Sequence, residues 1–211
     1  MPRTLGVNFI LNKAYRSLEF TGVWADTFGL PSDPFTMMIY GHPKNGKTSM
    51  CMMFAKYLTR FGKVWYNSIE EGDTKTIQDA FIRAGLHELE EGKFMLGDRY
   101  FFTDMVEKLA KPNSGRFVFV DSRDFINLTC QQFKKLKALF PRKSFIIVCW
   151  EAAGKPAGKF AKDIEFIVDV VVHVANFRAF VRSRFGGGKE YVIWDRKPVK
   201  GDQLKLNGVH A

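Results

Sequence analysis

The stretch that decides the fold covers residues 35–58 and reads FTMMIY, GHPKNGKT and SMCMMFAKYL. Residues 35–40 are almost all apolar and lie between a proline and a glycine, which predicts a buried strand. Large apolar residues then recur at three- and four-residue spacing over residues 47–60, which predicts a helix with one buried face. The segment between them, residues 41–48, matches G-x-x-x-x-G-K-[ST] in the strand–loop–helix context that this phosphate-loop pattern requires.

This loop predicts a binding site for a nucleoside triphosphate. Its glycines allow successive backbone amides to point at phosphate oxygens, and the following helix adds the partial positive charge of its N-terminus. Lys47 is expected to reach the β- and γ-phosphates, and the Thr48 hydroxyl is expected to coordinate Mg²⁺. The predicted cofactors are therefore ATP and Mg²⁺. The predicted nucleotide-binding residues are Gly41, His42, Pro43, Lys44, Asn45, Gly46, Lys47, Thr48 and Ser49.

Acidic residues follow two further predicted strands. A four-residue apolar run ends at Asp121, where a carboxylate can hold the Mg²⁺ shell through water. Glu70 and Glu71 follow another predicted strand, at the edge where open α/β sheets bind ligands. Because Ser122 and not an acid follows Asp121, we expect one glutamate to activate water, and Glu70 is nearer to the strand end. Alternatively, both glutamates begin the next helix, where acids favour the helix dipole.

The order of predicted elements indicates the fold class. Strands and helices alternate through the first 150 residues, which predicts βαβ units on a largely parallel sheet, and the closely spaced strands that follow predict an antiparallel addition at one edge. The expected fold is α/β, a three-layer sandwich with a mainly parallel central sheet and antiparallel edge strands. Strands are expected at residues 35–40, 63–69, 117–120, 144–150, 168–174, 179–183 and 190–194, and helices at 47–60, 74–84 and 129–140.

Length and composition set the domain organisation. A chain of 211 residues with 46% hydrophobic residues can bury one full core. We expect one domain, with a lead-in at residues 1–34, a core at 35–195 and a basic, mobile tail at 196–211. No apolar run approaches the length of a bilayer span and no secretory signal is evident, so a cytoplasmic protein without membrane contact is expected. The three cysteines and four histidines are scattered, without metal-ligand spacing or an evident carboxylate partner.

The charge is unevenly distributed along the chain. The net charge is +10, and residues 126–211 carry 16 basic and 7 acidic side chains, which is nearly all of the excess. This distribution indicates a surface that can face a polyanion, although solvated lysines without a partner give the same composition. A loop expected over residues 151–162 places three of these lysines together. They are Lys155, Lys159 and Lys162.

Taken together, these motifs resemble the RecA/RadA family of oligomeric ATPases, and the bacterial RadA branch most closely. After the phosphate loop, the chain reads KVWYNSIEE at residues 63–71, where RadA-like sequences have a strand followed by Glu-Glu. It then reads RAGL at residues 83–86, VDS at 120–122 and RSRFG at 182–186, in the same order as the family's Gly-Leu, I-D-S and K-N-R-F-G elements. The family's zinc-finger and Lon-like domains are not expected here.

The resemblance implies a RecA-like fold and a site shared between subunits. It implies a homo-oligomeric ring or filament with the nucleotide at the subunit interface, and it assigns water activation to Glu70. Arg182 and Arg184 would reach a neighbour's γ-phosphate as an arginine finger. Alternatively, these arginines contact DNA phosphates or only face solvent from a hairpin. The loop with the three lysines lies where the family places a mobile DNA-contacting loop, although a connector without a ligand fits equally well.

Two functions are compatible with these expectations. The first is a Mg²⁺-dependent ATPase that acts on DNA in recombination, repair or replication, with Lys47, Glu70, Arg182 and Arg184 as catalytic residues and Thr48 and Asp121 as metal ligands. The second is a nucleotide-gated oligomeric binding module with negligible turnover. The sequence does not separate them, because both require the same phosphate loop.

Overall fold

The computed structural model describes residues 3–195, and the predicted tail at 196–211 lies outside them. The described chain forms a central sheet with the strand order β3-β2-β4-β5-β1-β7-β8-β9. Strands β1 to β5 and β7 pair in parallel, β8 and β9 add antiparallel at one edge, and β6 forms a hairpin with the end of β5. The strands are β1 (Thr36–Gly41), β2 (Val64–Ser68), β3 (Phe94–Asp98), β4 (Phe117–Asp121), β5 (Ser144–Ala152), β6 (Lys155–Pro156), β7 (Val170–Ala175), β8 (Arg178–Ser183) and β9 (Tyr191–Val192).

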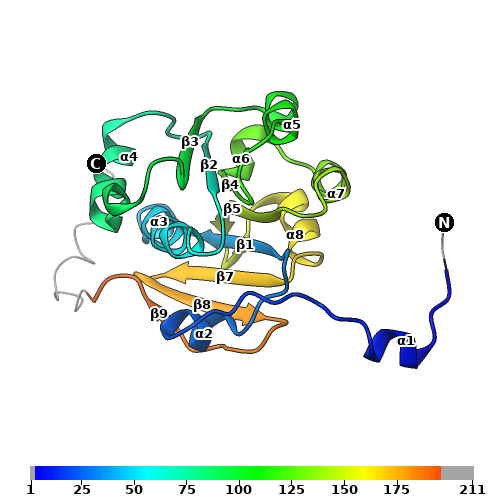
Figure 1. Cartoon of the computed structure of the whole chain (residues 1–211). Coiled ribbons are helices and arrows are strands. Elements are labelled where there is room, and N and C mark those ends of the chain that lie inside the picture. The colour runs from blue at the N-terminus through cyan, green and yellow to red at the C-terminus, as the bar shows by residue number, and fades with distance from the viewer. Residues whose placement is uncertain (1–2, 196–211) are drawn as a thin grey trace.

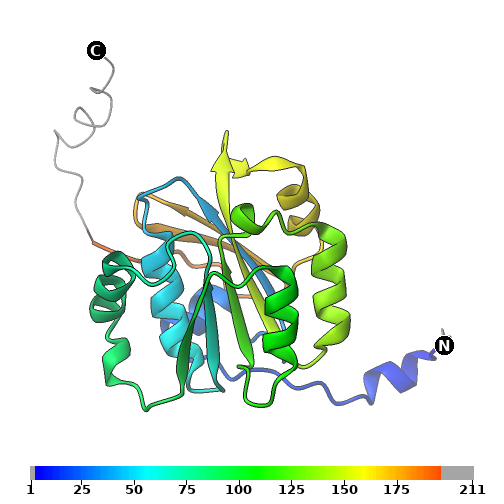
Figure 2. The same ribbon diagram turned by 90° about the horizontal axis from the view of Figure 1, so that it is seen from above.

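Helices cover both faces of this sheet (Figure 2). One face packs on α2 (Val23–Phe28), α3 (Lys47–Leu58), α4 (Lys75–Ala84) and the short 3-10 helix η1 (Leu86–Glu88). The other packs on α5 (Phe102–Ala110), α7 (Cys130–Leu139) and α8 (Gly158–Glu165). The short helix α6 (Arg123–Ile126) follows β4. The predicted three-layer α/β architecture is therefore confirmed.

The central strands are buried along their whole length, because helices cover them on both sides. Every residue of β1 and β2 is buried, so these strands read as continuous apolar runs and not as alternating ones. The parallel register brings the carboxyl ends of β1, β2, β4 and β5 to one edge of the sheet. We call this the carboxyl edge, and the opposite one the amino edge.

The N-terminal segment divides into two parts. Helix α1 (Val7–Leu11) has no buried residue and stands away from the body of the molecule (Figure 1). Leu18, Phe20 and Phe28, by contrast, are buried in the core beside α3. The ring of Phe20 lies 6.0 Å from that of Phe54 on α3, measured between centroids. The C-terminal half of the predicted lead-in therefore belongs to the core.

Some local predictions differ from the structure. Residues 151–162 do not form a loop: they form the β5–β6 hairpin and the start of α8, whose Ala161 and Ile164 pack in the core. The loop was predicted because of Gly154 and Gly158. Both have positive φ, and they form the turns between these elements. Helix α2 was not predicted. Within residues 3–195 no helix is long and apolar enough to cross a membrane.

Candidate nucleotide-binding site

The predicted phosphate loop forms the turn between β1 and α3. Gly46 is the N-cap residue of α3 and has a φ of 96°, which side-chain-bearing residues rarely adopt. A Cβ atom on Gly41 would lie 2.2 Å from the carbonyl oxygen of Val174, and one on Gly46 would lie 3.2 Å from the Phe177 ring. Gly46 is thus required by its conformation and Gly41 by close packing.

Lys47 and Thr48 begin α3 at the carboxyl edge. The ammonium of Lys47 donates hydrogen bonds to the carbonyl oxygens of Gly41, at 2.7 Å, and His42, at 3.0 Å. A lysine ammonium has three donors, so one remains for a phosphate oxygen. The side chain is half-buried and lies over the loop, in the position expected for a residue that binds phosphate.

Asp121 ends β4 beside this loop and accepts a hydrogen bond from the Tyr66 hydroxyl. Burial raises the pKa of Asp121 to about 6, the Tyr66 hydrogen bond opposes this shift, and the charges of Glu70 and Glu71 add to it. The charge of Lys47 also acts on this carboxyl group, which shows that the two predicted residues lie close together. A cation beside Asp121 would favour its ionised form, so the donor set fits a metal that carboxylates and phosphates share.

Glu70 and Glu71 lie directly after β2, next to Asp121. The backbone amide of Glu70 donates to the Asp121 carbonyl oxygen at 3.3 Å. The Oε2 atom of Glu70 accepts hydrogen bonds from the Ser122 hydroxyl and the Trp150 indole, each at 3.2 Å. These contacts hold the carboxylate in one place and leave its second oxygen for another partner.

Glu71 has the opposite environment. Its Oε2 atom is buried and has no hydrogen-bond partner, and burial together with the charge of Glu70 raises its pKa. Because an orphaned buried carboxylate oxygen is costly, this atom fits a ligand, a metal-bound water or a proton. The residue pattern predicts no separate role for Glu71, since a single sequence does not distinguish adjacent acids.

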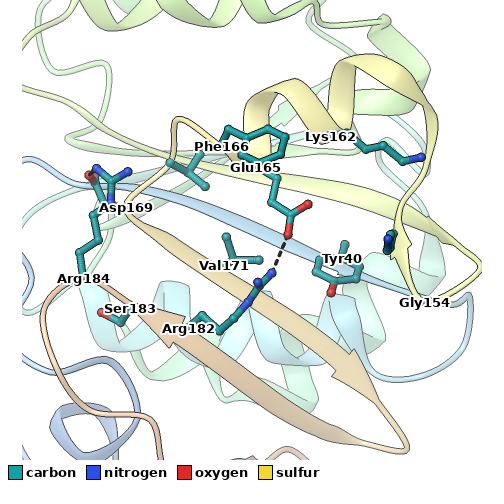
Figure 3. A pocket seen from close by; sticks show the side chains of 12 residues that line it. Tyr40, Gly154, Lys162, Glu165, Phe166, Asp169, Val171, Arg182, Ser183 and Arg184 are labelled. Carbon is teal, nitrogen blue, oxygen red and sulfur yellow. Dashed lines mark hydrogen bonds and ion pairs between the residues drawn. The ribbon is translucent and has the colours of Figure 1, made fainter.

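Arg182 and Arg184 do not meet the phosphate loop of their own chain. The register of β7 and β8 pairs Arg182 with Val171 and places Arg184 beyond the Ser183–Val170 pair, towards the amino edge. Arg182 pairs with Glu165 at 2.5 Å and Arg184 with Asp169 at 3.4 Å. Both line an open pocket of about 770 Å³ between α8 and β8, and Figure 3 shows the Arg182 guanidinium directed at Glu165.

The three predicted DNA-contacting lysines, Lys155, Lys159 and Lys162, are exposed on the β5–β6 hairpin and α8. Lys155 and Lys162 line the same pocket as the two arginines. They form a basic rim on ordered secondary structure and not on the mobile loop that was expected.

Two histidines share a carboxylate next to the phosphate loop, contrary to the expectation of scattered histidines. Glu151, at the end of β5, lies 3.3 Å from His42 and 2.9 Å from His173, measured between carboxylate oxygens and Nε2 atoms. The Glu151 side chain is only 6% exposed. This arrangement fastens the loop to β5 and β7, and sequence alone gave no signal for it because the three residues are far apart in the chain. Within residues 3–195 no group of three or more His, Cys, Asp or Glu side chains, this one included, is arranged to hold a metal ion by itself.

A small pocket lies on the other side of the loop, next to the first turns of α3. Its volume is about 240 Å³, and it opens beside Ser49 and Met53 of α3 and Arg83 of α4. Ile193 and Trp194 close it from the C-terminal side, and Ile193 also lies under Gly46 of the loop. The pocket is large enough for a nucleobase.

The comparisons with known proteins agree with the fold. A KaiC-like protein from the hyperthermophilic archaeon Pyrococcus horikoshii OT3 superposes with a TM-score of 0.52 at 17% identity, over 76% of this chain and 85% of that chain. No protein-family profile matches the sequence, and no curated protein matches it. At this identity the likeness shows the fold alone, which is RecA-like.

Proposed function

We propose that this chain binds ATP together with Mg²⁺ and hydrolyses it. The observation that carries the proposal is the convergence of Lys47, Asp121 and the glutamate pair at the carboxyl edge, next to the loop that Gly41 and Gly46 shape. A turn that served only to connect β1 and α3 would need neither the buried acid nor the lysine.

Each residue has a role in this proposal. The loop amides and Lys47 bind the β- and γ-phosphates, and the Thr48 hydroxyl and Asp121 hold Mg²⁺, which offsets the negative charge of these phosphates. Glu70 orients the attacking water and accepts its proton, because its carboxylate is fixed by Ser122 and Trp150. The buried oxygen of Glu71, which has no hydrogen-bond partner, would accept a hydrogen bond from a bound water or ligand. The adenine ring of ATP lies in the pocket beside Ser49 and Trp194.

Arg182 and Arg184 complete the site of a neighbouring subunit in this proposal. Arg182 lies on β8 and Arg184 directly after it, away from the phosphate loop of their own chain, and both side chains are exposed, so a second copy can reach them. A ring or filament with the nucleotide between subunits follows, as in the RecA/RadA family that the sequence resembles. The arginine charge then stabilises the transition state on the γ-phosphate.

We propose further that the ATPase acts on DNA, in recombination, repair or replication. This finer proposal is supported by the RadA-like order of motifs and by the basic rim of Lys155, Lys159 and Lys162, which lies beside the two arginines. Phosphate contacts by exposed lysines give affinity without sequence preference and depend steeply on salt.

The test of the proposed function is ATP hydrolysis by a Lys47→Ala variant. We expect turnover to fall by at least about 100-fold, since the variant loses the charge that stabilises the phosphates in the transition state. Lys56→Ala is the matched control: Lys56 lies on the same helix but pairs with Glu88 at 2.7 Å, away from the loop, and its variant should keep turnover. Equal rates in wild type and Lys47→Ala would contradict the proposal.

A nucleotide-gated module with negligible turnover is the second candidate. It is favoured by one observation: the Ser122 hydroxyl and the Trp150 indole already occupy Oε2 of Glu70, which leaves a single oxygen of this carboxylate for an attacking water. Tight ATP binding by the wild type without hydrolysis, with or without DNA, would support this candidate over the first.

A further inference from the structure

A cationic pocket lies at the amino edge of the sheet, at the end opposite to the nucleotide-binding site. Its volume is about 610 Å³, and it lies among the starts of β2, β4 and β5 and the loops that follow α5 and α7. Figure 2 shows these loops at the edge opposite to the β5–β6 hairpin. Five cationic side chains line it, and among the described residues no carboxylate does. They are Lys63, Lys111, Arg116, Arg142 and Lys143.

Most of these charges are not neutralised by the protein. Within the described part of the chain, Lys63, Lys111 and Arg142 form no salt bridge, and all three are exposed. Arg116 differs, because its guanidinium pairs with Asp33 and donates to the carbonyl oxygen of Phe61. The pocket therefore holds several cations that solvent alone compensates.

Lys143 lies deeper than the other lysines of the pocket. Its ammonium donates to the Gly115 carbonyl oxygen at 2.5 Å and to the Ser114 hydroxyl at 2.9 Å, which leaves one donor of three. Burial lowers the pKa of Lys143, so its charge is costly in the free protein. An anion at the remaining donor would offset that cost.

The helix ends near this pocket do not cancel its charge. Helices α5 and α7 end at Ala110 and Leu139, so their carboxyl termini point towards this edge. Each terminus carries about half a negative unit charge, which partly explains why lysine and arginine are favoured here. Two such ends are too few to balance the unpaired side chains, and a net positive pocket remains.

We propose that this amino-edge pocket binds phosphate groups of a nucleic-acid strand. Exposed cations spread around a wide, open pocket fit successive backbone phosphates better than one compact anion, which a small enclosed site would hold. Leu139, which is exposed, and the partly buried Phe140 offer an apolar surface for the sugar or base between phosphates. The site is distinct from the basic rim of Lys155, Lys159 and Lys162 and needs no nucleotide.

The test compares two double variants that remove the same charge. The pocket variant carries Lys111→Gln and Arg142→Gln and so loses two exposed cations of the pocket. The α7 control carries Lys134→Gln and Lys135→Gln and so loses two exposed lysines of α7 that do not line the pocket. Binding of a fluorescein-labelled oligothymidine of about 20 nucleotides is followed by anisotropy without ATP, over a range of salt concentrations. A Lys63→Gln variant repeats the test at a third position.

We expect the pocket variant to bind the strand about tenfold more weakly and the slope of log affinity against log salt to fall by about 1.4, for two lost phosphate contacts. The α7 control should stay within about threefold of wild type, because it keeps those contacts. Equal losses in the two variants, or none in the pocket variant, would overturn the proposal. Tripolyphosphate that competes as well as the strand at equal phosphate concentration would also overturn it, in favour of a small polyphosphate.

This outcome is independent of the nucleotide-binding site. Lys111 and Arg142 lie at the opposite edge, so ATP binding by the pocket variant should equal that of wild type. Strand binding lost together with ATP binding would indicate a folding defect, which the thermal transition of each variant detects. A failure of ATP binding in the wild type would remove the proposed function and leave this inference standing.

Discussion

The two edges of the same sheet carry opposite sets of charged groups. At the carboxyl edge, acids surround one phosphate-loop lysine: Asp121, Glu70, Glu71 and Glu151 all lie there. At the amino edge, five cations line a pocket without a carboxylate among the described residues. The comparison shows that the two edges of one sheet differ in the sign of the side chains that gather there.

The direction of the elements explains part of this difference. In βαβ units the helices start at the carboxyl edge and end at the amino edge, so backbone amides face the first and backbone carbonyls face the second. Amides bind phosphate without a side-chain charge, which leaves the acids of the carboxyl edge free to bind metal and water. At the amino edge the helix ends favour cations, and only side chains can bind an anion there.

Glu70→Gln is expected to have the largest effect on the carboxyl edge alone, as a loss of ATP turnover. This variant keeps the hydrogen bonds to Ser122 and Trp150 possible but removes the base, so turnover should fall by about 100-fold or more while ATP binding persists. Single-turnover hydrolysis and ATP binding measure the two quantities. Glu71→Gln serves as the comparison, and a larger loss there than in Glu70→Gln would move the catalytic role to Glu71. Binding of oligothymidine at the amino-edge pocket should not change in either variant.

A smaller effect is expected from mixing two inactive variants. A subunit with Lys47→Ala keeps Arg182 and Arg184, whereas a subunit with both arginines changed to alanine keeps its phosphate loop. If the arginines act on the neighbour, the mixture should recover turnover, up to about a quarter of wild type for random assembly of neighbouring pairs. Steady-state hydrolysis at a series of mixing ratios measures this. Turnover in the double arginine variant alone at the wild-type rate would show that these residues have no catalytic role.

The smallest effect concerns stability and tests the charge of the carboxyl edge. The pKa of Asp121 rises from its ordinary value of 3.8 to about 6 in the folded chain, so the ionised carboxylate opposes folding. This cost is absent below a pH near 4 and is fully present above a pH near 6. Asp121→Asn should therefore raise the free energy of unfolding by about 3 kcal/mol at neutral pH and above.

Thermal melts of Asp121→Asn and wild type over a pH series measure this prediction. The variant should melt about 6 °C higher at neutral pH, and the difference should vanish in acid. If Asp121 holds Mg²⁺ as proposed, Mg²⁺ and ATP should raise the melting temperature of the variant less than that of wild type. A variant less stable than wild type at neutral pH would show that Asp121 is not destabilised by burial.

Most of the sheet could be predicted from the sequence, and the reason is physical. Strands such as β1 and β4 are buried on both faces, so their apolar runs end sharply at Gly41 and Asp121. The turn between β1 and α3 was predictable because the phosphate-loop pattern fixes both the spacing and the residue types of such a turn. The hairpin at residues 155–156 and the start of α8 were missed because a glycine indicates a turn but not the type of the next element.

Contacts between distant residues could not be predicted. The sharing of Glu151 by His42 and His173 depends on the β1–β5 and β1–β7 pairing. The amino-edge pocket brings together Lys63, Lys111 and Arg142, which no local pattern connects. The hydrogen bonds of Glu70 likewise come from Ser122 and Trp150, which follow or lie on other strands. A single sequence holds no signal for such proximity.

The central claim is that the loop between β1 and α3 binds a triphosphate. Calorimetric titration of the full chain with ATP, with and without Mg²⁺, tests it most directly, and Lys47→Ala serves as the control. The account predicts saturable heat at one site per chain, strengthened by Mg²⁺ and lost or strongly weakened in the variant. No saturable heat from folded wild-type protein, or equal binding by the variant, would contradict it.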